Sequence, residues 1–185
     1  MYKGLLSALA WLTFTVPSVH AAGIDITVSG QAEGVISIDL FEEVAPLHVE
    51  RITTLAAAGR YNGVVFHRVI EGFMAQTGDV QFGKLGSDMR RAGRGGSDLP
   101  NLPAEFSDVP FDRGVVGMAR AQSPDSANSQ FFIMFDEGYF LNGQYTVVGR
   151  VTDGLDVLDS IKLGQGGNGA VIGAPDVMQN VAVTD

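Results

Sequence analysis

The stretch that decides the fold of this 185-residue chain runs from Phe66 to Asp79 and has the sequence FHRVIEGFMAQTGD. Its first half continues a β-branched run, so residues 64–70 are predicted to form one strand. Arg68 is the exception in this strand, because its neighbours are apolar and a guanidinium among them needs a partner or a groove. The stretch therefore predicts a strand that carries one candidate functional side chain.

Upstream of this stretch the pattern changes from strands to a helix. Residues 24–28 and 34–40 alternate between apolar and polar side chains, which predicts two strands joined by a hairpin turn at 30–34. Pro46 suits the first position of a helix, and Gly59 follows as its C-terminal stop. The predicted apolar stripe of this helix is Val49, Ile52, Leu55 and Ala56.

Downstream of the stretch, the glycine- and arginine-rich residues 78–112 predict a long ordered loop, which in a compact domain is more often functional than idle. The helices are too few for a parallel sheet with crossover helices, so a closed antiparallel barrel or a sandwich fits best. No internal repeat or linker divides the chain. The remaining predicted elements are strands over 114–119, 130–135, 145–151 and 177–183 and a helix over 154–163.

The N-terminal residues have the layout of a secretory signal peptide. Lys3 supplies a positive charge, residues 5–16 are mostly apolar, and Val19-His20-Ala21 places small residues where a signal peptidase cuts. We expect a signal peptide over residues 1–21 and a folded domain over residues 22–185. An uncleaved anchor or a buried helix is the alternative. No other stretch is long enough to span a bilayer, so no membrane contact is expected after cleavage.

Composition excludes several classes of function. The formal net charge is −9 and the pI is about 4.6, which disfavours binding to nucleic acid. Absence of cysteine excludes disulfides and zinc–thiolate sites, and the three histidines are too scattered to suggest a metal site. With 45% hydrophobic residues the chain can form a packed core.

Three separate runs carry a resemblance to a known family. Residues 66–79 resemble the signature segment of cyclophilins, which are peptidyl-prolyl cis-trans isomerases. Residues 117–121 and 128–133 are similar to the other half of that family's active site, and residues 140–149 to the part that completes its proline pocket. The runs follow the family's order and spacing. The resemblance implies a mainly β fold, namely a closed eight-stranded antiparallel β-barrel capped by two α-helices, with the site on its outer face.

The resemblance also implies a role for each site residue. Arg68 is the expected catalytic residue, and Gln76 and Gln130 are expected to bind substrate and to order it. The backbone at Ala119, Arg120 and Ala121 is expected to pair with the residue before proline. Gly96 is expected to line a secondary pocket. The expected pocket for the proline ring consists of Phe73, Met74, Phe132, Phe140 and Leu141, with Tyr145 at its rim.

The implied reaction is rotation about the bond before proline, which has a barrier of about 18–20 kcal/mol. No covalent bond changes, so we expect no nucleophile, metal or cofactor. In the twisted state the proline nitrogen can accept a hydrogen bond, and the always-charged Arg68 is a suitable donor. Since no proton is transferred, His67 is interpreted as structural. Phe66 is interpreted as scaffold, Phe131 as core, and His48 as exposed.

Several positions depart from the family's pattern. Thr77 stands where the family usually has glycine, and Glu71 where proline is common, so the local backbone geometry is expected to differ. Arg120 stands where eukaryotic members often have asparagine, which favours acidic substrates. Phe140 stands where drug-sensitive members have tryptophan, so cyclosporin binding is expected to be weak.

The leading hypothesis is a monomeric isomerase that acts on proline-containing polypeptides and assists the folding of exported proteins in the periplasm of a Gram-negative cell. A binding module or holdase that uses the groove without turnover is the alternative. Arg68 favours the enzyme, because pure binding needs no transition-state donor. A β-barrel carrier of small ligands needs a hollow lumen, and the many large apolar residues in the strands argue against one.

Overall fold

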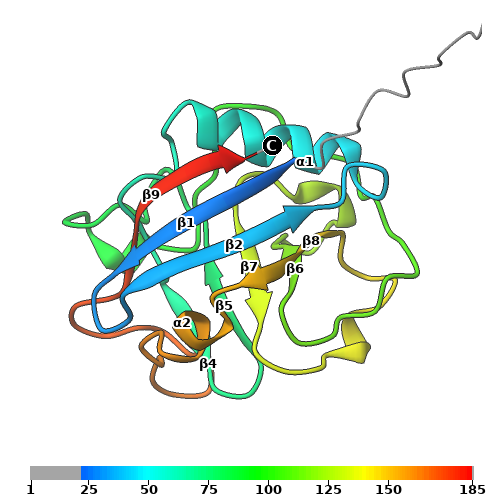
Figure 1. The fold of residues 1–185 in the computed structure, drawn as a ribbon. Helices are drawn as coiled ribbons and strands as arrows, with labels where there is room; N and C mark the ends of the chain where they lie inside the picture. The colour runs from blue at the N-terminus through cyan, green and yellow to red at the C-terminus, as the bar shows by residue number, and fades with distance from the viewer. Residues whose placement is uncertain (1–21, 185) are drawn as a thin grey trace, which may run out of the picture.

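One curled antiparallel β-sheet dominates the computed structural model, which describes residues 22–184 (Figure 1). The predicted signal peptide over residues 1–21 lies outside the described residues. Within the described residues, no helix is both long and apolar enough to cross a membrane. The nine strands are β1 (Gly23–Ser29), β2 (Gly34–Leu40), β3 (Val64–Val65), β4 (Arg68–Ile70), β5 (Met74–Thr77), β6 (Val115–Met118), β7 (Phe131–Met134), β8 (Val147–Asp153) and β9 (Val177–Thr184).

The predicted hairpin is confirmed. β1 and β2 pair antiparallel from Gly23 opposite Asp39 to Val28 opposite Gly34. The alternation that predicted them has the expected cause, because every second side chain is buried, as in Ile24 and Ile26. β1 also pairs with β9 at the other end of the chain, so the first and last strands lie side by side (Figure 1).

The prediction of a closed eight-stranded barrel is wrong. The strand order is β3-β9-β1-β2-β8-β6-β7-β5-β4, which is an open half-barrel with β3 and β4 at its two edges. The predicted single strand over 64–70 is divided, because Phe66 N–H donates to Asp176 O beside β9, whereas His67 N–H donates to Gln76 O in β5. The chain thus leaves one edge of the sheet and joins the other. The alternation pattern did not predict β5.

Loops cover both edges of the sheet. At β3, Val65 N–H donates to Gly83 O at 2.8 Å. At β4, Val69 N–H donates to Gly169 O at 2.8 Å, and Val69 O accepts from Gly164 N–H at 2.9 Å. Loop coverage of this kind protects sheet edges against pairing with strands of other chains.

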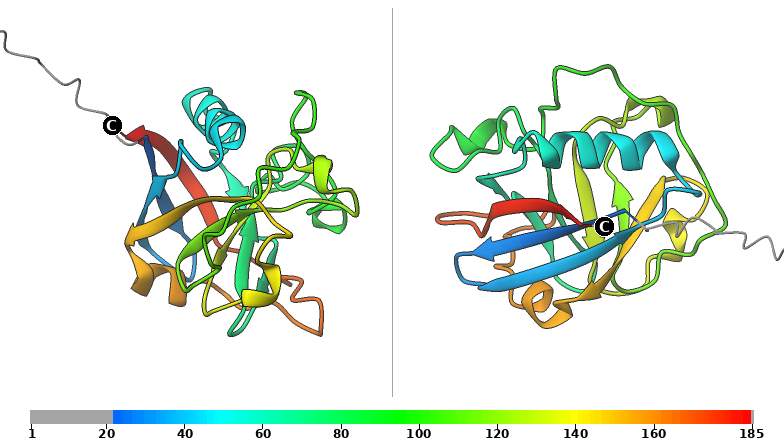
Figure 2. Two further views of the ribbon diagram at one scale, coloured as in Figure 1. Left: turned by 90° about the vertical axis from the view of Figure 1, so that its right-hand side faces the viewer. Right: turned by 45° about the horizontal axis from the view of Figure 1, so that its top comes forward.

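Two helices lie at opposite ends of the curled sheet (Figures 1 and 2). α1 (Pro46–Ala57) buries the predicted apolar stripe and ends as predicted at Gly59, whose φ is +64°. α2 (Leu155–Asp159) is shorter than the predicted helix over 154–163. The Asp176 carboxylate accepts from Lys162 N–H at 2.6 Å, and this bond holds the backbone after α2 outside a helix.

His48 is buried, so the prediction that it is exposed is wrong. The loop over residues 78–112 returns to α1 and brings Glu105 onto its first turn. The Glu105 carboxylate lies 2.6 Å from His48 Nδ1 and accepts from the backbone N–H groups of Leu47 and His48. The contact joins residues far apart in sequence, so the helical pattern of α1 alone could not reveal it.

β7 separates two apolar clusters. Phe131 belongs to the larger cluster, which draws side chains from all nine strands and both helices and fills the inside of the curled sheet. Phe132 points the other way into a smaller cluster with Met74 and Phe111. This confirms the prediction that Phe131 is a core residue on the opposite side of its strand. The filled interior argues against a hollow carrier and places the candidate site on the outer face.

Candidate active site

Arg68 lies in β4 directly opposite Gln76 in β5, and both side chains point to the outer face of the sheet. Its Nε donates to the carbonyl of Asn168 at 2.9 Å, and its Nη1 donates to Gln76 Oε1 at 3.2 Å. Within residues 22–184, Nη2 makes no hydrogen bond. Partial burial lowers the pKa of Arg68, but a guanidinium stays charged at neutral pH. The side chain is therefore a fixed cation whose Nη2 has no acceptor among the described residues.

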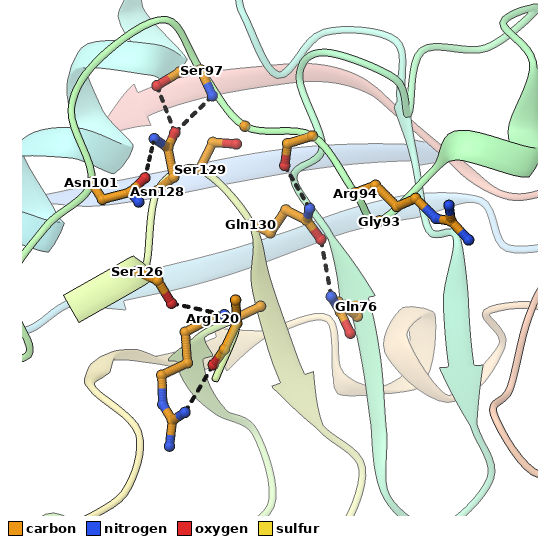
Figure 3. Close-up of a pocket in the computed structure, with 14 residues that line it drawn as sticks. Gln76, Gly93, Arg94, Ser97, Asn101, Arg120, Ser126, Asn128, Ser129 and Gln130 are labelled. Atoms are coloured by element: carbon orange, nitrogen blue, oxygen red, sulfur yellow. Dashed lines mark hydrogen bonds between the residues drawn. The ribbon is translucent and has the colours of Figure 1, made fainter. Parts of the chain in front are cut away.

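Two glutamines extend this arrangement away from Arg68. Gln76 Nε2 donates to Gln130 Oε1 at 3.0 Å, and Gln130 Nε2 donates to the carbonyl of Gly95 at 2.7 Å (Figure 3). Each amide therefore accepts from one neighbour and donates to the next, which fixes the orientation of both amides. Gln76 thus contacts Arg68 directly, and Gln130 fixes the orientation of Gln76.

An apolar pocket of about 240 Å³ opens beside Arg68. Its floor is the smaller apolar cluster, with Phe132 stacked on Phe111 at 5.8 Å between ring centroids. A proline ring is small and apolar, and this surface suits it. The pocket is lined by Arg68, Phe73, Met74, Gln76, Arg120, Phe132, Phe140, Leu141 and Tyr145.

The rim of this pocket is aromatic and partly exposed. Phe140 is 67% exposed and packs on Phe73 at 5.5 Å between ring centroids. The Arg120 guanidinium lies 4.4 Å from the centroid of the Tyr145 ring. It also donates to the backbone carbonyls of Gln144 and Ala121. Arg120 therefore joins the two sides of the rim.

A second, more polar pocket of about 410 Å³ adjoins the first, and Gln76 and Arg120 line both (Figure 3). Asn128 holds its far wall, because its Oδ1 accepts from Ser97 N–H and its Nδ2 donates to Leu99 O. A side chain at Gly96 would meet Asn128 Cγ at 2.9 Å. The predicted residues in this pocket are Gln76, Gly96, Ala119, Arg120, Ala121 and Gln130.

The backbone between the two pockets is suited to bind an extended peptide. Ala119 N–H donates to Gln130 O, and Ala121 N–H donates to Ser126 Oγ. Within the described residues, the N–H and C=O of Arg120 make no hydrogen bond. An added strand could pair with these two groups.

All the predicted site residues therefore line one of two adjoining pockets. Sequence reasoning missed Asn168, which anchors Arg68, and assigned no role to Asn128, although Asn128 begins the run 128–133. Asn168 stands in a glycine-rich loop far along the chain from Arg68. Only the folded geometry brings the two together.

A family model described as "Cyclophilin type peptidyl-prolyl cis-trans isomerase/CLD" matches residues 23–183. The chain belongs to this family. A probable peptidyl-prolyl cis-trans isomerase of Brucella suis is 50% identical over 180 residues, covering 94% of this chain and 92% of the relative. A human protein, peptidyl-prolyl cis-trans isomerase-like 3, is 39% identical over 133 residues, covering 70% of this chain and 76% of the relative. This cyclophilin is thus a peptidyl-prolyl isomerase by family.

Solved structures agree on the cyclophilin fold. Cyclophilin AquaCyp293 from Hirschia baltica has a TM-score of 0.68 at 28% identity, over 86% of this chain and 73% of that one. A cyclophilin-type isomerase from Cryptosporidium parvum, solved in the presence of the dipeptide Ala-Pro, has a TM-score of 0.72 at 24% identity. That match covers 88% of this chain and 99% of the other and concerns the fold alone.

Thr77 is accommodated where the family usually has glycine. Its side chain is fully buried at the end of β5, and its hydroxyl donates to Val65 O at 3.0 Å. The hydrogen bond satisfies the extra polar group and ties β5 to β3, the strand at the opposite edge of the sheet. In this cyclophilin the added hydroxyl thus links the edge strand β3 to β5, the neighbour of the other edge strand β4.

His67 lines neither pocket, although it adjoins Arg68 in sequence. Its ring packs against the backbone of Gly93, where an added Cβ would lie 3.0 Å from the ring. Burial lowers the pKa of His67 below 6.5, and nearby Asp79 opposes this effect in part. The neutral ring is therefore favoured at neutral pH, which suits a structural histidine.

The variant His67→Gln tests this role. Because the folded-state pKa is lowered, the unfolded chain takes up the proton first, so the free energy of unfolding decreases as the pH falls below 6.5 toward the folded-state pKa. We expect this decrease to be smaller in His67→Gln, measured by urea unfolding between pH 7 and pH 5. At pH 7 its kcat/KM should stay within about twofold of wild type. A loss of a hundredfold or more in a folded variant would mean that His67 acts in the reaction.

Proposed function

We propose that this cyclophilin accelerates rotation about X-Pro bonds by a hydrogen bond from Arg68 to the proline nitrogen of the twisted amide. The proposal rests on the position and hydrogen bonds of the Arg68 guanidinium. Hydrogen bonds from Nε to Asn168 O and from Nη1 to Gln76 Oε1 hold it at the edge of an apolar pocket, and within residues 22–184 Nη2 has no partner. The reaction requires a fixed donor of this kind next to a site for the ring.

The proposal follows from how the amide changes during rotation. In either planar form the nitrogen lone pair is delocalised and a poor acceptor, whereas in the twisted form it is available. A donor at this position therefore stabilises the transition state more than either ground state, which is the condition for catalysis. The apolar pocket holds the ring while the preceding carbonyl swings.

Removal of the guanidinium tests the mechanism. A charged hydrogen bond contributes about 1.5–3 kcal/mol, so Arg68→Ala should lower kcat/KM about tenfold to a hundredfold in a protease-coupled proline-peptide assay. Arg60→Ala, which removes an exposed arginine at neither pocket, is the control and should retain wild-type activity. An Arg68→Ala variant as fast as wild type would contradict the mechanism. If wild type itself binds peptide without turnover, the groove serves a binding module or holdase.

We also propose a preference for acidic residues next to proline. Arg68, Arg94 and Arg120 line the two pockets, and no acidic residue lines either, although the chain as a whole carries −9. Such a patch attracts negative charge locally in an otherwise repulsive field.

Peptides that differ in the residue before proline test this preference. We expect kcat/KM for Glu-Pro to exceed that for Lys-Pro about threefold to tenfold at low salt, and the ratio to approach one in Arg120→Asn. The ratio should also shrink as salt is added, since the screening length falls to about 8 Å at physiological ionic strength. Equal rates for both peptides at low salt would contradict the proposal.

Weak binding of cyclosporin is a further proposal, based on Phe140. This exposed ring lacks the indole N–H that tryptophan supplies in drug-sensitive cyclophilins. A hydrogen bond of this type contributes about 0.5–1.5 kcal/mol, so Phe140→Trp should tighten inhibition about twofold to tenfold. The check is the inhibition constant of both proteins in the peptide assay. A nanomolar constant for wild type would contradict the proposal.

We further propose that the chain is exported to the periplasm, where it acts as a monomer on unfolded exported proteins and assists their folding. Lys3, the apolar residues 5–16 and the small residues before Ala22 support export. N-terminal sequencing of fractionated cells should find a chain that starts at Ala22 or Gly23 in the periplasmic fraction. A cytoplasmic chain that retains the signal would contradict export.

A further inference from the structure

Asp79 is a buried carboxylate that no role in the proposed reaction explains. It lies two residues after the end of β5, it is 0% exposed, and it forms no ion pair within residues 22–184. Its charge is stabilised by backbone groups instead. Oδ1 accepts from Gln81 N–H at 3.1 Å and Phe82 N–H at 2.8 Å. Oδ2 accepts from Gly93 N–H at 2.8 Å and Gly95 N–H at 3.0 Å.

These four hydrogen bonds fix a segment that has little rigidity of its own. Residues 93–96 have the sequence Gly-Arg-Gly-Gly, and Gly93 has a φ of +87°. Glycine backbones lose more entropy on ordering than any other, so such a segment needs an anchor to keep one conformation. Charge-assisted hydrogen bonds to a buried carboxylate are about twice as strong as neutral ones and suit this purpose.

Gly95 connects this anchor to the hydrogen bonds that hold Arg68. Its N–H donates to Asp79, and its carbonyl accepts from Gln130 Nε2 at 2.7 Å. Gln130 in turn accepts from Gln76, which accepts from Arg68 (Figure 3 shows the bond between Gln76 and Gln130). The hydrogen bonds are thus continuous from the buried carboxylate to the guanidinium.

We propose that Asp79 is a positioning residue for the isomerase, which sets the orientation of Arg68 through Gly95, Gln130 and Gln76. The inference rests on the proposed role of Arg68 as donor to the proline nitrogen. Without the anchor, the Gly95 carbonyl loses its fixed place, and the Gln130 and Gln76 amides lose the acceptor that determines which way they face. Arg68 then keeps its charge, but its guanidinium is no longer held in one orientation.

Asp176 provides a matched control. It is also a buried aspartate, 1% exposed, whose carboxylate accepts from backbone N–H groups, at Ala32 and Lys162. It lines neither pocket. Asp176→Asn therefore weakens a buried carboxylate that also anchors backbone N–H groups, but whose side chain makes no hydrogen bond to Gly95, Gln130, Gln76 or Arg68.

The experiment compares both variants in activity, stability and NMR spectra. We expect Asp79→Asn to lower kcat at least about tenfold, with a smaller change in KM, because misplacement of a catalytic group affects mainly the transition state. The Nε–H resonance of Arg68 and the side-chain amide resonances of Gln76 and Gln130 should shift. Asp176→Asn should lower the melting temperature to a similar degree and leave kcat/KM and these resonances close to wild type.

A double variant separates this inference from the proposed function. If Asp79 acts through Arg68, Asp79→Asn should cost less than about twofold in an Arg68→Ala background. The same loss in both backgrounds would overturn the inference, as would a folded Asp79→Asn variant with wild-type kcat. If Arg68→Ala alone is fully active, the proposed function fails instead.

Measurements on wild type keep the inference testable if Asp79→Asn does not fold. The amides of Gly93 and Gly95 should exchange slowly and show couplings through the hydrogen bonds to the Asp79 carboxylate carbon. Gln130→Met cuts the connection one step later, and it should lower kcat in wild type but not in Arg68→Ala. Absent couplings, or an equal loss from Gln130→Met in both backgrounds, would overturn the inference.

Discussion

The register between β4 and β5 is the constraint on which the rest of the site depends. It sets Arg68 opposite Gln76 on the outer face and turns their neighbours Val69 and Ala75 into the larger apolar cluster. A slip of one residue would exchange these faces and bury the guanidinium in the core. Because the core tolerates no such exchange, apolar packing inside the sheet fixes the position of the charged group outside it.

The sequence predicted what depends on local periodicity and missed what depends on distant contacts. Alternation in β1 and β2 and the separation of Phe131 from Phe132 follow from the pleat of a strand. The resemblance named residues that the fold brings together around two adjoining pockets. His48 and Asn168 could not be placed in this way, because their partners Glu105 and Arg68 are far away in sequence. The open sheet was missed for the same reason, since it depends on where residues 64–70 change partners.

The site combines two kinds of surface, each with its own support. The apolar pocket rests on the smaller cluster beneath Phe132, whereas the polar pocket is held by the Asn128 side chain and the glycine segment after Arg91. Arg120 and Gln76 belong to both. A substrate chain that crosses the boundary therefore meets a rigid hydrophobic surface on one side and a hydrogen-bonded loop on the other, so changes in specificity and in catalysis can arise separately.

The position of β9 between β1 and β3 has a consequence for when the molecule can fold. The strand made last occupies a place inside the sheet, so β1 and β3 have no common neighbour until the C-terminal residues have been synthesised. Contacts of such long sequence separation form slowly and cannot form on a growing chain that still lacks its end. The part of the sheet that joins β1 to β3 can therefore be completed only after residues 177–184 have been synthesised.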